Sequence, residues 1–400
     1  VFFGGSIDFA TLGNTGLAGQ TIAEVYEANG ASAIWSNVIK YVGAGAIATG
    51  GVISLLKSLP LIIKTFAGAM KSLKNRSGGT NVRTDRDLKM PVVLGIILIV
   101  IILIWLEPSV PVSLLGAFLI AIFGFFFATV SSRMVGLIGS SNNPVSGMAI
   151  ATLLISTFVL KATGNTGMAG MTGAIAIGSI ICVIAAIAGD TSQDLKTGFI
   201  VGATPAKQQV GELIGVVASG FAIAGVMSLL NKAWGFGSAE IPAPQATLMK
   251  MIVEGIMDAK LPWVLVFMGV FLALALEVLR VPVMPFAIGL YLPIYLSCGI
   301  MVGGVVRLFL DKKKEAEAKK KEMISNGTLY CAGMIAGEGL VGILMAVLAI
   351  IKVGDNSIAA IIGGLFNLSG AAGNIVGLIV LALMILSLLK FSVWSKTKSK

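Results

Sequence analysis

The sequence predicts an all-α polytopic membrane protein with about ten membrane segments, some of them broken or re-entrant. Hydrophobic residues make up 56% of the 400 residues and charged residues only 12%, against roughly 25% charged residues in soluble domains. The mean hydropathy is +0.95. Because apolar stretches of spanning length recur along the whole chain, we expect one transmembrane domain over residues 1–400.

The N-terminal part of the chain is Gly-rich and polar, which predicts a loop and a short helix over residues 1–33. A Gly-rich apolar stretch over 41–56 is the first predicted membrane segment. Residues 57–89 then carry eight Lys or Arg, and this density predicts a basic loop on the cytoplasmic side. The next apolar stretches, 90–106 and 112–132, predict an up-down pair of helices.

The central part of the chain combines an interrupted segment with regular ones. The stretch 134–160 has no charge before Lys161, but Asn142-Asn143-Pro144 predicts a break in it. An amphipathic run over 245–257 predicts a helix at an interface. Three uninterrupted spans are also predicted here: 168–189, 213–230 and 261–276.

Residues 281–306 form an unusual apolar segment, because they contain three prolines and no charge. A single crossing would place the basic run 311–322 outside, whereas its Lys content favours the cytoplasmic side. A broken or re-entrant hairpin over 281–306 resolves this conflict. The last predicted spans are 323–353 and 374–389, and the lysines that follow predict a cytoplasmic C-terminus.

Composition also excludes several classes of function. The net charge of +10 arises from Lys and Arg in the predicted loops, so it does not indicate nucleic-acid binding. Histidine is absent, and the three cysteines Cys182, Cys298 and Cys331 lie in apolar stretches without metal-ligand spacing. No nucleotide-binding or catalytic motif is present, so we expect no cofactor, no metal site and no enzyme activity.

Two polar patches interrupt the apolar chain. The first is Gly-Ser-Ser-Asn-Asn-Pro-Val-Ser-Gly at 139–147, and the second covers 189–198 and 202–209. Polar groups at membrane depth are costly, and irregular backbone persists there only inside protein or around water. The patches therefore predict a lined path by which something polar crosses the membrane.

Together with the segments 243–250 and 285–293, these patches resemble signatures of the oligopeptide transporter (OPT) family, prokaryotic branch. The resemblance covers residues 34–390. It implies a secondary active transporter in the plasma membrane of a prokaryote that imports small oligopeptides. Family members are usually longer than this chain, which starts at Val1. We therefore expect the sequence to be the C-terminal portion of a longer transporter.

The first patch reads as a helix start, because Asn and Ser cap helices and Pro suits the first turn. Such an N-terminus either caps a helix at the membrane edge or faces an anionic group such as a peptide carboxylate. Side-chain amides suit peptide bonds because they both donate and accept hydrogen bonds. The candidate substrate-path residues are Ser140, Ser141, Asn142, Asn143, Gln193, Lys196, Gln208, Gln209, Gln245, Lys250 and Tyr291.

Without histidine, a proton carrier has to be a carboxylate. Burial disfavours the charged form, so a carboxylate at membrane depth can take up and release a proton. The alternative reading of each such group is a solvated helix end. The candidate proton-coupling residues are Asp190, Asp194, Glu212 and Glu338.

Other classes of function stay open at this point. Within the same family the alternative is a metal-chelate or siderophore transporter. A channel would conduct without uphill accumulation, and an intramembrane hydrolase would need a nucleophile with a base or paired carboxylates. The expected partners are the peptide or peptide-like chelate, protons and the lipid bilayer. A homo-oligomer is left open.

Overall fold

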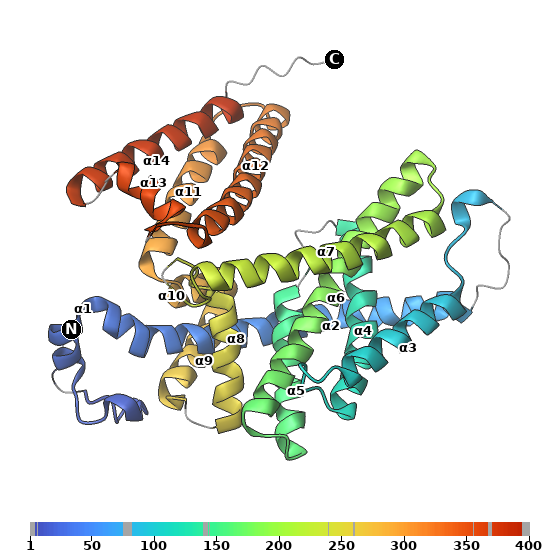
Figure 1. The fold of residues 1–400 in the computed structure, drawn as a ribbon, viewed down its shortest axis with the longest axis horizontal. Coiled ribbons are helices and arrows are strands. Elements are labelled where there is room, and N and C mark those ends of the chain that lie inside the picture. Colours follow the sequence, from blue (N-terminus) through green and yellow to red (C-terminus); the bar gives the residue numbers. More distant parts are fainter. Residues whose placement is uncertain are drawn as a thin grey trace. The chain divides into compact units, whose positions relative to one another are not determined.

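Helices form almost all of the regular structure in the computed structural model of the chain (Figure 1). The structure describes residues 5, 7–74, 82–138, 143, 145–238, 240–258, 261–354, 356–366 and 370–393. The chain divides into two compact units, one made of Val1–Val217 and Pro244–Pro293, the other of Ala218–Ala243 and Ile294–Lys400.

The first unit contains the helices that surround the larger core. A capping box between Thr21 and Glu24 starts its first helix, and a π-helical turn at Trp35–Ile39 links this helix to the next. Its helices are α1 (Ile22–Ile34), α2 (Lys40–Lys74), α3 (Met90–Leu106), α4 (Leu114–Ile138), α5 (Val145–Ala162), α6 (Gly167–Val201), α8 (Pro244–Asp258), α9 (Trp263–Val278), α10 (Val283–Tyr291) and the first part of α7 (Pro205–Ala233).

Small residues let the helices of this unit approach closely. A Cβ atom on Gly45 of α2 would overlap the carbonyl oxygen of Val266 on α9, and one on Gly269 would overlap that of Val42. Such close crossings between small residues are typical of membrane helices, which gain little from burying apolar area against lipid. The fully buried side chains of the core include Ile47, Ile177 and Leu248.

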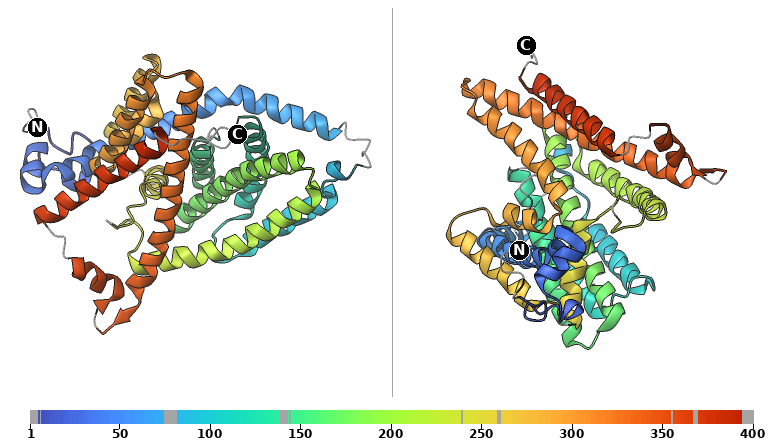
Figure 2. Two further views of the ribbon diagram at one scale, coloured as in Figure 1. Left: turned by 90° about the horizontal axis from the view of Figure 1, so that it is seen from above. Right: turned by 90° about the vertical axis from the view of Figure 1, so that its left-hand side faces the viewer.

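The second unit consists of the rest of α7 together with α11 (Ile294–Lys312), α12 (Glu317–Ile350), α13 (Ile358–Phe366) and α14 (Gly370–Val393). A two-residue hairpin, β1 (Lys352–Val353) with β2 (Asn356–Ser357), pairs antiparallel before α13. Helices α12 and α14 lie side by side (Figure 2). The Ser392 hydroxyl donates to the Met323 carbonyl oxygen at 2.7 Å, which fixes their antiparallel pairing.

The predicted all-α membrane architecture is confirmed. Seven helices of the described residues are long and apolar enough to cross a membrane: α3, α4, α6, α7, α11, α12 and α14. Shorter apolar helices occupy 147–162 and 263–278, and the predicted segment 41–56 lies within α2. Each of the roughly ten predicted segments therefore contains a helix.

Several predicted boundaries differ from the structure. The basic segment 57–89 begins as helix, because α2 continues to Lys74 through Pro60. Residues 134–138, expected in the broken span, instead complete α4, and α5 begins after the break at Val145. The described break therefore separates two helices. Asn143 is non-helical, while its neighbours 139–142 and 144 lie outside the described residues.

The basic run 311–322, expected as a loop, is also largely helical. Helix α11 extends to Lys312 and α12 begins at Glu317, so only 313–316 connects them. In this run the Lys319 ammonium forms an ion pair with the Glu315 carboxylate at 3.0 Å. The predicted break in 281–306 is present, since α10 ends at Tyr291 and α11 starts at Ile294. The re-entrant course of this segment stays a prediction.

Candidate functional site

The second polar patch builds a tight corner between two long apolar helices. Helix α6 runs unbroken through 190–201, so the patch is helical where irregular backbone was a candidate. It ends with Gly202 in the left-handed conformation at φ 74°, and the Ala203 amide donates to the Gly198 carbonyl oxygen at 2.7 Å. Glycine suits this position, and Pro205 suits the first turn of α7.

Gln208 holds the two sides of this corner together. Its Nε2 donates to the Asp194 carbonyl oxygen at 2.5 Å, which ties α7 to the last turns of α6. A Cβ atom on Gly198 would overlap the Gln208 amide, so the glycine provides the space that the amide occupies. In this structure Gln208 is therefore committed to a backbone carbonyl.

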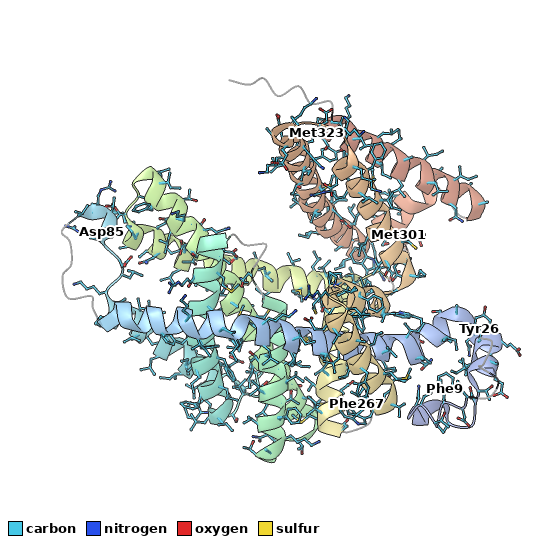
Figure 3. All side chains as sticks on the ribbon, turned by 180° about the vertical axis from the view of Figure 1, so that it is seen from behind. Phe9, Tyr26, Asp85, Phe267, Met301 and Met323 are labelled. Carbon is cyan, nitrogen blue, oxygen red and sulfur yellow. The ribbon has the colours of Figure 1, made fainter. Side chains whose placement is uncertain are left out.

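The extended segment before α3 docks on the same corner. The Arg83 guanidinium donates to the Thr204 hydroxyl at 3.0 Å and to the Gly202 carbonyl oxygen at 2.8 Å. Gln209 accepts from the Leu88 amide at 2.9 Å, and its Nε2 lies 3.4 Å from an Asp87 carboxylate oxygen. Figure 3 labels Asp85 on this segment. Residues 82–88 thus become part of the site.

Below this polar rim lies a cavity of about 380 Å³ with Glu212 in its wall. Thr191 hydrogen-bonds to the Glu212 side chain, and Asp194 adds a second negative charge nearby. The Glu212 Oε1 atom is buried and has no hydrogen-bond partner in the described part of the chain. The other walls are mainly apolar and come from α3, α6 and α7: Met90, Val93, Ile96, Ile97, Ile187, Leu213 and Val216.

An unpaired carboxylate oxygen beside an apolar cavity favours one kind of occupant. A buried acceptor without a partner is costly, and a cationic or hydrogen-bond-donating group removes that cost. The cavity can therefore accept a protonated amine or an amide at Glu212, or Glu212 itself can take a proton. The neighbouring amide of Gln209 and hydroxyl of Thr191 add polar contacts at the same end.

Asn143 of the first patch lies on the opposite face of α6. Its Nδ2 donates to the Ser131 hydroxyl at 2.7 Å and to the Ala185 carbonyl oxygen at 3.3 Å. Its Oδ1 is buried without a partner in the described residues. Because Ala185 and Thr191 point to different sides of a helix, Asn143 does not line the Glu212 cavity.

The remaining predicted residues do not join this site. Asp190, Gln193 and Lys196 are exposed on α6, as are Gln245 and Lys250 on α8, where Lys250 pairs with Glu254 at 3.5 Å. Glu338 is exposed on α12 of the second unit. Ser140, Ser141 and Asn142 lie outside the described residues.

Tyr291 packs in the core of the first unit and does not line the Glu212 cavity. It is 2% exposed, and its hydroxyl donates to the Pro244 carbonyl oxygen at 2.9 Å. Gly43 of α2 approaches its backbone, since a Cβ atom there would lie 2.7 Å from the Tyr291 nitrogen. Tyr291 thus joins α2, α8 and α10 within the core.

Sequence reasoning missed the contribution of residues 82–88 and of Thr191. Arg83 belongs to the segment 57–89, whose Lys and Arg content predicts a cytoplasmic basic loop, and no local pattern distinguishes a docked segment from such a loop. In the described part of the chain, no group of three or more Cys, Asp or Glu is placed to hold a metal ion.

Comparison with known proteins identifies the family. The OPT oligopeptide transporter family profile matches residues 11–349. The chain belongs to the OPT oligopeptide transporter family. The matched region contains α1–α11 and most of α12, and with them both polar patches and the Glu212 cavity. The chain is therefore a multi-pass membrane protein of a transporter family.

Individual OPT relatives give the branch. A Haemophilus influenzae protein classed as an oligopeptide transporter is 31% identical over an alignment of 366 positions, which covers 79% of this chain and 57% of that protein. The Arabidopsis thaliana protein YSL5, classed as a metal-nicotianamine transporter, is 27% identical over 49% of this chain and 29% of its own length. The rice protein YSL11 of the same class is 26% identical over 50% and 30%.

The same alignments give the share of each relative's length that this chain covers. The chain spans 57% of the length of the Haemophilus relative and 29% and 30% of the lengths of the two plant relatives. The prokaryotic relative thus matches over more of the chain, and at higher identity, than the plant relatives do. No solved structure matches the chain.

Proposed function

We propose that this chain is part of a secondary active transporter that imports small oligopeptides across the plasma membrane of a prokaryote, driven by protons. The principal support is the 31% identity with the Haemophilus influenzae protein, whose name assigns it to oligopeptide transport. The expected partners are the peptide, protons and the bilayer, with the C-terminus in the cytoplasm. Oligomer formation is left open.

The observation that carries the site assignment is the unpartnered Glu212 Oε1 beside the cavity. A peptide offers an ammonium group and backbone amides, and both can donate to this oxygen. When the substrate is absent, a proton on Glu212 neutralises the buried carboxylate. A neutral carboxyl group costs less free energy to bury than an unpaired negative charge. Glu212 is therefore our first choice of coupling residue, ahead of Asp190, Asp194 and Glu338.

The direct test is uptake into proteoliposomes. Panels of labelled di- to pentapeptides and of metal chelates are offered with and without an imposed proton gradient. We expect saturable, uphill peptide accumulation only when the gradient is present. Conductance without saturation would instead indicate a channel, and accumulation without a gradient would remove proton coupling from the proposal.

The residue-level test compares four amide variants. Glu212→Gln is expected to lower gradient-driven accumulation roughly tenfold or more, the loss typical of one buried charged hydrogen bond. Counterflow exchange of substrate should be partly retained. Glu27→Gln is the matched control, because Glu27 is exposed on α1 of the same unit and is not a coupling candidate. If Glu212→Gln, Asp190→Asn, Asp194→Asn and Glu338→Gln all accumulate peptide normally, the coupling group lies elsewhere.

The second candidate function is transport of a metal chelate. Its support is the similarity of about half of the chain to plant proteins classed as metal-nicotianamine transporters. A chelating ligand that carries an amine can donate to the same Glu212 oxygen as a peptide ammonium group does. Competition between a peptide and a chelate in the uptake assay decides which is the better substrate.

A further inference from the structure

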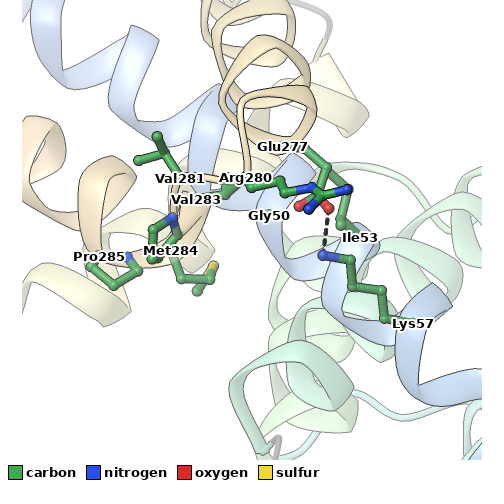
Figure 4. A pocket seen from close by; sticks show the side chains of 10 residues that line it. Gly50, Ile53, Lys57, Glu277, Arg280, Val281, Val283, Met284 and Pro285 are labelled. Atoms are coloured by element: carbon green, nitrogen blue, oxygen red, sulfur yellow. Dashed lines mark ion pairs between the residues drawn. The ribbon is translucent and has the colours of Figure 1, made fainter.

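A second pocket of the first unit carries charges that the transport site does not use. It lies between α2, the end of α9 and the start of α10, and its volume is about 380 Å³ (Figure 4). Lys57, Glu277 and Arg280 contribute its charged groups. The remaining lining is apolar and includes Val281 and Met284.

The charges of this pocket leave one cation in excess. The Lys57 ammonium forms an ion pair with the Glu277 carboxylate. Arg280 forms no ion pair with any residue that the structure describes. Figure 4 shows its side chain extending toward Glu277 along one side of the pocket. An arginine fork is well suited to a phosphate group, which it can bind through two parallel hydrogen bonds.

Arg280 has a strained backbone conformation, which points to a role for its side chain. Its φ is 57°, in the left-handed region. The Val281 amide donates to the Leu276 carbonyl oxygen at 2.9 Å and the Arg280 amide to that of Glu277 at 3.1 Å, which closes the end of α9. Glycine is the usual residue at this position. An arginine held there at a backbone cost indicates a use for its guanidinium.

The surroundings of the pocket suit the boundary of a bilayer. Val278 and Leu279, next to Arg280 in sequence, are 83% and 70% exposed. Lys57 is the first of the basic residues predicted to face the cytoplasm. A cation in excess, beside exposed apolar side chains at a membrane surface, matches a ligand with an anionic head and an acyl tail.

We propose that this pocket binds the headgroup of an anionic phospholipid, with Arg280 on the phosphate and Lys57 beside it. The apolar wall at Val281 and Met284 then faces the glycerol backbone and the start of the acyl chains. The site is separate from the Glu212 cavity, since the two share no lining residue. A variant can therefore lose lipid binding and keep peptide transport, or lose peptide transport and keep lipid binding.

The test measures the melting temperature of the full chain in detergent with added phosphatidylglycerol, phosphatidylcholine or soluble glycerol 3-phosphate. We expect only phosphatidylglycerol to raise it. Arg280→Gln and Arg280→Gly should each weaken that binding roughly tenfold or more, the loss typical of a charge-assisted hydrogen-bonded pair. Lys64→Gln, which removes one exposed positive charge elsewhere on α2, should keep the full response.

The two Arg280 variants also separate binding from folding. Glycine fits φ 57° without strain, so Arg280→Gly without lipid should melt at or above the temperature of the unmodified chain. Undiminished phosphatidylglycerol responses in both variants would overturn the proposal. An equal response to phosphatidylcholine or to glycerol 3-phosphate would also overturn it. A response to dipeptides that depends on Arg280 would instead assign the pocket to the transported substrate.

Discussion

At the scale of single residues, Asn143 shows how a polar side chain is accommodated where two helices meet. Its Nδ2 bridges the Ser131 hydroxyl and the Ala185 carbonyl oxygen, while its Oδ1 is buried without a partner in the described residues. Ser131 itself donates to the same Ala185 carbonyl oxygen. The helix contact therefore keeps one hydrogen bond even without the amide.

This arrangement gives a prediction for Asn143→Leu. The free energy of unfolding should change by no more than about 1 kcal/mol, because the loss of the two neutral hydrogen bonds of Nδ2 is offset by the removal of one unsatisfied buried oxygen. If the first polar patch lines the substrate path, peptide uptake should be abolished. Thermal melting and uptake are measured together on the same preparation.

Asn165→Leu serves as the control for that experiment. Asn165 is exposed between α5 and α6, and its Nδ2 donates to the Thr163 hydroxyl over a long distance of 3.4 Å. It should transport normally. Normal uptake by Asn143→Leu would show that Asn143 has only a structural role.

At the scale of helices, the crossing of α2 and α9 depends on two glycines in reciprocal positions. Gly45 faces the Val266 carbonyl oxygen and Gly269 faces that of Val42, so each helix lies against the backbone of the other. A backbone atom cannot rotate away as a side chain can. The packing of these helices is therefore sensitive to a single added methyl group.

We predict that Gly269→Ala destabilises the fold by about 2 kcal/mol or more, since the new methyl meets backbone and not a movable side chain. Gly215→Ala on α7 is the matched control, because no atom of the described residues outside the helix's own backbone lies within 4 Å of a Cβ atom there. It should stay within about 1 kcal/mol of the unmodified chain. Equal melting temperatures for the two variants would show that the α2–α9 contact is looser than described.

At the scale of the whole molecule, hydrophobic periodicity is enough to predict the class and most of the helices. Residues 90–106 were predicted as a span and form α3 with these bounds. The length of α2 could not be predicted, because Lys at 57 and 64 reads equally well as a loop and as the polar face of a helix. Charge density reports the solvent environment and not the backbone conformation.

The site was less predictable than the fold, for a physical reason. The sequence indicates Gln208 and Gln209 as substrate-path candidates and Glu212 as a coupling candidate, and the structure places Gln209 and Glu212 in the cavity wall. Whether the predicted residues of α6 join them depends on which face of that helix each residue occupies and on which segment docks against that face. Arg83, far away in sequence, is held at this corner by long-range contacts that carry no local signal.

The topology prediction belongs to this scale. Positive charge predicts that 57–89, 311–322 and 390–400 share the cytoplasmic side. In a chain whose three cysteines are replaced, Asp85→Cys and Lys314→Cys should react with a membrane-impermeant reagent from the same side. Labelling of Lys314→Cys from the opposite side would contradict the hairpin expected over 281–306.

The length of α2 has a mechanical consequence. Its 35 residues extend for about 52 Å, well beyond a hydrocarbon layer of about 30 Å. The part that continues from Lys57 to Lys74 is thus a lever arm of about 25 Å. A tilt of about 10° where α2 crosses α9 at Gly45 would move the end of α2 at Lys74, about 44 Å along the helix, sideways by about 8 Å. A sub-ångström adjustment among the packed glycines thereby becomes a movement that a spin label or fluorophore on the arm can register.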